Sequence, residues 1–112
     1  MRTPLRQEIL NQTFEVIRLV RPVVEAIGRR DRDLSSQVRR AMSSVGLNLA
    51  EGFGTAAGNA RLRFETARGS LCEAQAGIGI AIAWGFVSAP DAGPALQAMD
   101  ALGARVFGLS RR

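Results

Sequence analysis

The apolar residues of this chain recur every three or four positions in four separate segments, which is the spacing of one face of an α-helix. No segment alternates apolar and polar residues over a strand length, so we expect no β-strand. The chain has 112 residues, which suits a single domain over residues 1–112. The pattern predicts an all-α fold, an up-down antiparallel four-helix bundle with helices over residues 4–28, 34–54, 59–85 and 93–110.

Local signals suggest where these helices begin and end. Thr3 followed by Pro4 favours a helix start, because Thr accepts from unpaired amides and Pro is tolerated at the first helical position. Pro22 predicts a kink or a break, because it removes one hydrogen bond of the helical ladder. Asp33 or a following Ser is the expected cap of the second helix, and Asn59 that of the third. The Pro-rich and Gly-rich stretch from residue 86 to 94 predicts a loop.

Two helices carry more apolar surface than one bundle core can use. The first helix has a stripe made of Leu5, Ile9, Val16, Leu19, Val20, Val23 and Ile27, widened by further apolar residues at its sides. The third has a second apolar face of mostly small residues, opposite its core stripe. Soluble monomers seldom leave such a patch in water, so the simplest expectation is a homo-oligomer. The expected interface residues are Leu47, Leu62, Gly69, Ala76, Ile80 and Ala83. The alternative is that these two helices are the most buried pair of the bundle.

The residue types argue against an enzyme and against a metal or cofactor site. The chain lacks His, Lys and Tyr, so the usual bases beside a Ser or Cys nucleophile are missing. The lone cysteine, Cys72, excludes an internal disulfide, fits a reducing cytoplasm, and is expected to be a buried, inert thiol. The Gly-x-Gly-x-x-Ala run over residues 52–57 ends a predicted helix and is better explained as a turn than as a dinucleotide site. The uncharged run over residues 74–90 is too short and too polar for a membrane span.

The charge balance leaves nucleic acid open as a partner. The formal net charge is +5, and all 15 basic residues are Arg. Arg pairs bidentately with phosphate, and clusters repeated in an oligomer would add their fields. The candidate polyanion-binding residues are Arg29, Arg30, Arg32, Arg39, Arg40, Arg61, Arg63 and Arg68. The structural alternative is that Arg39 and Arg40 form ion pairs with Glu51 or with Glu73, inside the bundle or between subunits.

Two sequence motifs carry a family resemblance. The first combines Ser35-Ser36-Gln37-Val38-Arg39-Arg40-Ala41 with Asn48-Leu49-Ala50-Glu51-Gly52-Phe53-Gly54. The second is Phe64-Glu65-Thr66-Ala67-Arg68-Gly69-Ser70-Leu71-Cys72-Glu73. Together they resemble the four-helix-bundle family first noticed as proteins encoded in intervening sequences of bacterial large-subunit ribosomal RNA. The motif positions to which the resemblance gives a structural role are Arg39, Arg40, Asn48, Glu51, Gly52, Phe53, Gly69, Ser70 and Glu73.

The resemblance adds an assembly and two functional hypotheses. It implies a homopentameric ring in the bacterial cytoplasm, without catalytic activity. The first hypothesis is a non-enzymatic scaffold or adaptor of poorly defined role. The second comes from a related branch, the accessory proteins of diversity-generating retroelements. It is a basic pentamer that binds RNA or DNA, or a nucleic-acid-processing protein, through phosphate contacts. The chain departs from the common family pattern at Gly46, Leu47 and Gln75.

Overall fold

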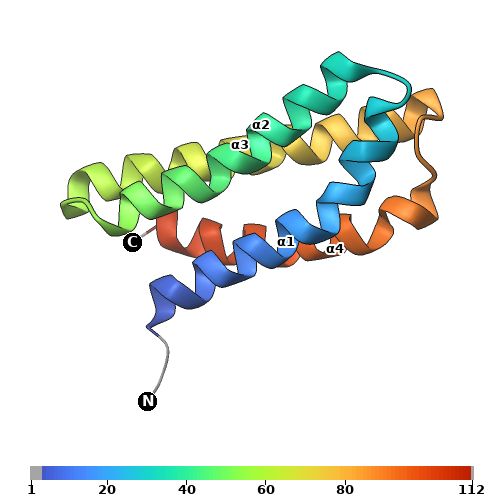
Figure 1. The fold of residues 1–112 in the computed structure, drawn as a ribbon. Helices are drawn as coiled ribbons and strands as arrows, with labels where there is room; N and C mark the ends of the chain where they lie inside the picture. The colour runs from blue at the N-terminus through green and yellow to red at the C-terminus, as the bar shows by residue number, and fades with distance from the viewer. Residues whose placement is uncertain (1–3, 112) are drawn as a thin grey trace.

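Four helices account for nearly all of the chain, as the 3.6-residue spacing of its apolar residues requires. The computed structural model describes residues 4–111, except for the side chain of residue 57. Its elements are α1 (Leu5–Gly28), α2 (Arg32–Phe53), α3 (Ala57–Trp84) and α4 (Ala89–Ser110). No strand occurs between residues 4 and 111. Each helix packs against the next and α4 returns to α1, so the four run up and down around a common core (Figure 1).

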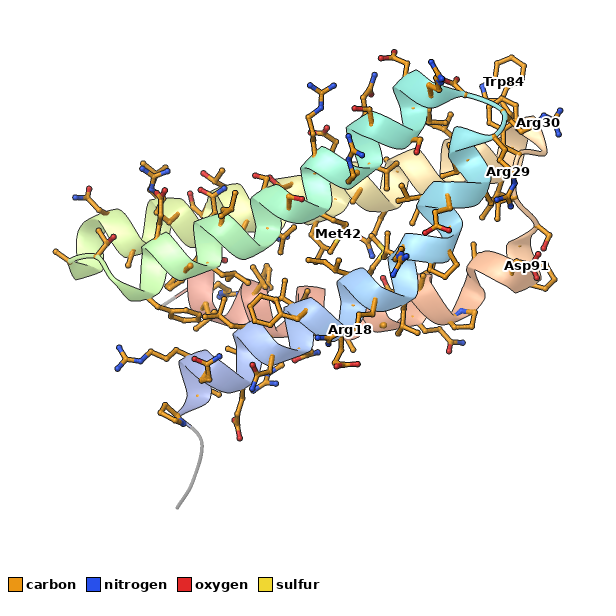
Figure 2. All side chains as sticks on the ribbon, viewed as in Figure 1. Arg18, Arg29, Arg30, Met42, Trp84 and Asp91 are labelled. Carbon is orange, nitrogen blue, oxygen red and sulfur yellow. The ribbon has the colours of Figure 1, made fainter. Side chains whose placement is uncertain are left out.

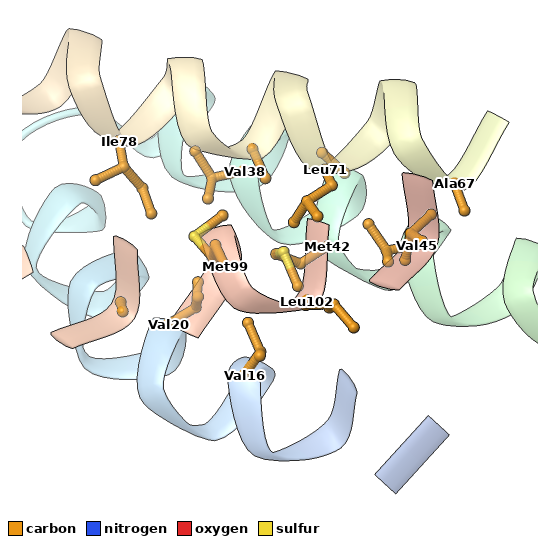
Figure 3. Close-up of a cluster of buried hydrophobic side chains, with 14 of the residues drawn as sticks. Val16, Val20, Val38, Met42, Val45, Ala67, Leu71, Ile78, Met99 and Leu102 are labelled. Atoms are coloured by element: carbon orange, nitrogen blue, oxygen red, sulfur yellow. The ribbon is translucent and has the colours of Figure 1, made fainter. Parts of the chain in front are cut away.

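The predicted core stripes are largely those that the structure buries. Val16 and Val20 of α1, Val45 of α2 and Leu102 of α4 meet in the interior with residues of α3 (Figure 3). Burying a side chain of this size contributes roughly 1.5–3 kcal/mol. Two members of the predicted α1 stripe do not take part, because Leu5 and Leu19 are each almost half exposed. The apolar arc of α1 is wider than the strip that its neighbours cover.

Several predicted helix starts are wrong by a few residues. The side chain of Asp31, not Asp33 or a Ser, caps α2 by accepting from the backbone N–H of Leu34 at 2.9 Å. Ala56 precedes α3 with no side-chain cap, so Asn59 already lies inside the helix. Thr3, the predicted start of the first helix, lies outside the described residues.

The predicted loop before the fourth helix is shorter than expected. The side chain of Ser88 accepts from the backbone N–H of Asp91, and α4 begins at Ala89. Pro90 is tolerated there because a backbone N–H in the first helical turn has no partner within the helix, so the N–H that proline lacks is not missed. Gly85 ends α3 in the left-handed conformation, with φ of 78°, which allows the chain to turn sharply into α4.

Pro22 does not end α1, which continues through it to Gly28. The helix changes direction in its second half (Figure 1), as expected where a proline removes a ladder hydrogen bond. The exposed position of Pro22 leaves the core face of the helix intact.

The helices α2 and α3 pack most closely, and glycines make this possible. A Cβ atom placed on Gly77 would lie 2.5 Å from Cγ2 of Val38, and one placed on Gly52 would overlap the Phe64 ring. Side chains at these two positions would therefore force the helices apart. Ser44 of α2 and Ser70 of α3 share a hydrogen bond of 2.8 Å across the same contact.

Candidate functional site

An apolar ridge runs along the outer face of α3, opposite its core side. Its members lie at helical spacing and all are exposed, and three of them are large: Leu62 is 62% exposed, Ile80 48% and Trp84 71%. Between these lie small exposed residues, and we call the whole set the α3 ridge: Leu62, Gly69, Ala76, Ile80, Ala83 and Trp84. The predicted second face of the third helix is therefore present and uncovered in the single chain.

Trp84 belongs to this ridge although it is not among the interface residues predicted from the sequence. It lies four residues after Ile80, a spacing that could have identified it. Its indole stacks on the Phe86 ring with a centroid distance of 6.4 Å, and the Arg30 guanidinium lies 5.4 Å from the Phe86 centroid. Figure 2 shows Trp84 and Arg30 at the bundle end where α1 turns into α2. Leu47, the remaining predicted interface residue, is 67% exposed on α2 but stands among polar neighbours.

A second apolar surface lies between α1 and α2. Here a groove of about 330 Å³ has Ile17, Val20, Val24 and Met42 among its lining residues, and we call it the α1/α2 groove. Met42 points into the space between the two helices (Figure 2). The groove also carries charged and polar side chains from both helices, Arg21, Glu25, Arg39 and Ser43. The chain thus presents two different apolar surfaces on two of its sides.

The predicted polyanion-binding arginines do not form one patch. Arg29, Arg30 and Arg32 lie at the end of the bundle where α1 turns into α2 (Figures 1 and 2). Arg61 and Arg63 lie at the opposite end, where α3 begins. Arg39 and Arg40 are exposed along the side of α2, and Arg68 is exposed on α3 toward the end that holds Arg61 and Arg63. A single phosphate-binding surface made of all eight residues is excluded by this separation.

The excess positive charge gathers at the end that holds both chain termini, which we call the termini end (Figure 1). It consists of residues 4–8, 51–68 and 105–111. Its glutamates are Glu8, Glu51 and Glu65, against twice as many arginines: Arg6, Arg61, Arg63, Arg68, Arg105 and Arg111. In the rest of the described chain, arginines and acids are equal in number. Three of the six, Arg6, Arg105 and Arg111, are not among the polyanion-binding residues predicted from the sequence.

The termini end also contains local pairs that hold some of these arginines. Arg63 lies 3.0 Å from Glu51, and Arg61 lies 3.6 Å from Glu65. Arg68 and Arg111 instead flank the Phe107 ring, at 4.3 and 5.3 Å from its centroid. Neither of these two forms an ion pair with any described residue. Their guanidinium groups are held in place on one aromatic ring without being neutralised.

The predicted ion pairs of the family motif differ from those observed. Glu51 pairs with Arg63, and neither Arg39 nor Arg40 forms an ion pair among residues 4–111. Glu73 likewise has no ion-pair partner in this part of the chain and lies exposed on α3, between the Gly69 and Ala76 positions of the ridge. Arg39 and Glu73 therefore remain available for contacts outside the chain.

The other motif positions build the contact between α2 and α3. The side-chain amide of Asn48 donates to the Ser44 carbonyl at 2.9 Å and to the Ser44 hydroxyl at 3.0 Å, while Arg63 donates to its oxygen. This polar network includes the hydrogen bond between Ser44 and Ser70. Gly52 provides room for Phe64, whose ring lies 5.2 Å from that of Phe53. Outside the motif, Gln75 donates to Asp100 of α4 at 2.8 Å.

The described residues offer little that could serve as a catalytic nucleophile or a metal site. Cys72 is exposed, so the prediction of a buried thiol is wrong: it stands beside the uncovered ridge rather than beside a neighbouring helix. No group of three or more potential metal ligands lies together among the described residues. None of the helices within residues 4–111 is both long and apolar enough to cross a membrane. The candidate features of the molecular surface are therefore exposed apolar area, on the α3 ridge and in the α1/α2 groove, and arginine charge at the termini end.

The comparisons with known proteins identify one family. Residues 6–108 match the family described as 23S rRNA-intervening sequence protein. The match covers all but the ends of the chain and includes both motifs of the sequence analysis. No curated protein and no solved structure matches the chain.

Proposed function

The chain belongs to the family of 23S rRNA-intervening sequence proteins, and on that premise we propose that it is a non-enzymatic, homo-oligomeric scaffold that docks partner proteins. In the proposed assembly the copies form a ring of five, the number that the family resemblance implies. The observation that carries the proposal is the α3 ridge, a line of exposed apolar residues opposite the core. In a monomer this apolar surface would stay exposed to water, whereas association of several copies would bury it.

A closed ring needs two different surfaces on each copy, because each subunit contacts the next head to tail. The α3 ridge and the α1/α2 groove supply such a pair, one projecting and one hollow. Their charges are complementary, since Glu73 stands on the ridge and Arg39 lines the groove. The ridge of one copy therefore packs into the groove of the next, and Glu73 of one copy pairs with Arg39 of the other.

Light scattering tests the assembly directly. The expected mass is about 60 kDa, five times the 12.0 kDa of one chain, and a clean species at the mass of one chain would refute the proposal. The charge pair is tested by exchange: Glu73→Arg and Arg39→Glu each weaken the oligomer, and the double variant restores it. Glu15→Arg makes the same charge change as Glu73→Arg on an exposed position of α1 and leaves the mass unchanged. If the double variant forms no more oligomer than the single variants do, Glu73 and Arg39 do not pair.

A second candidate function, binding to the phosphate backbone of RNA or DNA, is favoured by the charge at the termini end. The two unpaired arginines on the Phe107 ring, Arg68 and Arg111, are its natural phosphate contacts. Binding of this kind reads no sequence and weakens steeply as salt rises. Titrating a short RNA and a DNA duplex at two salt concentrations tests it, with Arg68→Glu expected to lower the affinity. Absence of binding at low salt rules it out.

A further inference from the structure

An apolar hollow of about 470 Å³ opens at the termini end, where all four helices begin or finish. Its volume lies in the range of sites that hold a ligand or an anchoring side chain. Most of its lining residues are apolar, and the other two are exposed arginines. The residues that matter here are Leu5, Phe53, Phe64 and Leu109, with Arg6 and Arg61.

The two arginines give this hollow a definite charge preference. Arg6 has no ion-pair partner among the described residues, and the Nε atom of Arg61 is a loose 3.6 Å from Glu65. Beyond the hollow, Arg68 and Arg111 add further positive charge on the Phe107 ring. An occupant must therefore combine an apolar body with negative charge.

We propose that this hollow docks an acidic, apolar segment of a partner protein, and the proposal rests on the adaptor function given above. A bulky apolar side chain of the segment enters the hollow, and neighbouring carboxylates pair with Arg6 and Arg61. An apolar anchor in a pocket with arginines beside it is the usual composition of an interface centre. The partner is thus recognised by alternating acidic and large apolar residues.

The arrangement of the two phenylalanine side chains in the hollow favours a peptide over a nucleotide base as the occupant. A base needs a flat, open aromatic face on which to stack. Phe64 is only 8% exposed, and the half-buried Phe53 is tilted against it by 55°, so the two rings form an uneven floor. Leu5 and Leu109 complete the walls with aliphatic surface, which suits Leu or Phe side chains better than a base.

Fluorescence anisotropy with the full-length protein provides the test. The probe is a fluorescein-labelled peptide of alternating Glu and Leu with a central Phe. The comparison probes are the same peptide with Lys in place of Glu, and labelled oligothymidylate. We expect the acidic peptide to bind and the basic peptide not to bind. Arg6→Glu and Arg61→Glu should each weaken the affinity about tenfold, while Arg32→Glu, at the other end of the bundle, should not change it.

The apolar part of the site has its own matched pair of variants. Leu5 and Leu19 are equally exposed, at 46% and 45%, but only Leu5 lines the hollow. Leu5→Ser is expected to weaken peptide binding severalfold, and Leu19→Ser to leave it unchanged. Both replace an exposed side chain, so the helical circular dichroism spectrum of each should match that of the parent.

Three results would overturn the proposal. The first is that the acidic peptide does not bind, or binds no better than the basic one. The second is that Arg32→Glu weakens binding of the acidic peptide as much as Arg6→Glu does. The third is tighter binding of oligothymidylate with the same dependence on Arg6 and Arg61, which would assign the site to nucleic acid. Light scattering on the same samples separates the two proposals, since peptide binding by a monomer would refute only the ring.

Discussion

The close contact between α2 and α3 predicts that one substitution has opposite effects at two neighbouring glycines of α3. Gly77 and Gly79 are both helical, and Ala is the better helix former, so Gly→Ala on its own stabilises a helix by roughly 0.5–1 kcal/mol. The new methyl group meets nothing within 4 Å at Gly79, whereas at Gly77 it would lie 2.5 Å from Cγ2 of Val38. Only at Gly79 is the propensity gain free of a steric cost.

The size of the effect at Gly77 follows from its neighbour. Val38 is fully buried and β-branched, so its Cγ2 cannot swing away and either the helices or the rotamer must shift. Overpacking of this kind costs about 1–3 kcal/mol, which exceeds the propensity gain. We therefore expect Gly77→Ala to lower the free energy of unfolding by ~1–2 kcal/mol, and Gly79→Ala to raise it by ~0.5–1 kcal/mol.

Urea unfolding followed by helical circular dichroism measures both changes, at one fixed protein concentration because association adds to the apparent stability. A double-mutant cycle identifies the cause. Val38→Ala removes the atom that the new methyl would strike, so the double variant Val38→Ala/Gly77→Ala should be more stable than the two single effects predict, by ~1 kcal/mol. If Gly77→Ala stabilises the protein as much as Gly79→Ala does, the two helices are not held together by this contact.

Three further predictions concern helix capping, the core and the free thiol. Asp31→Ala removes the hydrogen bond to the Leu34 amide and should cost about 1 kcal/mol in the same urea assay, whereas an unchanged midpoint would contradict the capping role. Leu102→Ala leaves a cavity at a fully buried position and should cost roughly 2–5 kcal/mol; a loss below 1 kcal/mol would mean that α4 does not pack as described. Cys72 should react with a thiol reagent in the native protein as fast as in urea when the protein is monomeric, and slower when the ridge beside it is covered.

The sequence predicted the helices well because their core stripes obey one simple spacing. Ile9, Val16, Val20 and Ile27 of α1 are all buried, as the period of 3.6 residues requires. The same rule placed Leu19 on the stripe although it is 45% exposed. A helical period says which residues share a side of the helix, but the width of the covered strip depends on how neighbouring helices cross it. That information is absent from a local pattern.

The helix ends and the charge clusters were harder to predict, for a different reason. Asp31 and Ser88 cap their helices through single hydrogen bonds, and nearby Asp33 and Pro94 offered competing local signals of similar strength. A sequence shows only how far apart two arginines lie along the chain. In an up-down bundle, the end of one helix returns beside the start of another, so Arg6 joins Arg61 although 55 positions separate their numbers.

The arrangement of surfaces would allow one small bundle to serve both proposed roles, self-association and partner binding. The α3 ridge and the α1/α2 groove both run along the sides of the bundle, so copies joined through them stand side by side. In the proposed ring, side-by-side packing would leave the ends of each bundle uncovered, and the termini ends of all copies would face the same way along the ring axis. Each copy would present the hollow between Arg6 and Arg61 on that face. A partner with several acidic segments would bind such an array far more tightly than one copy, because each contact after the first is intramolecular.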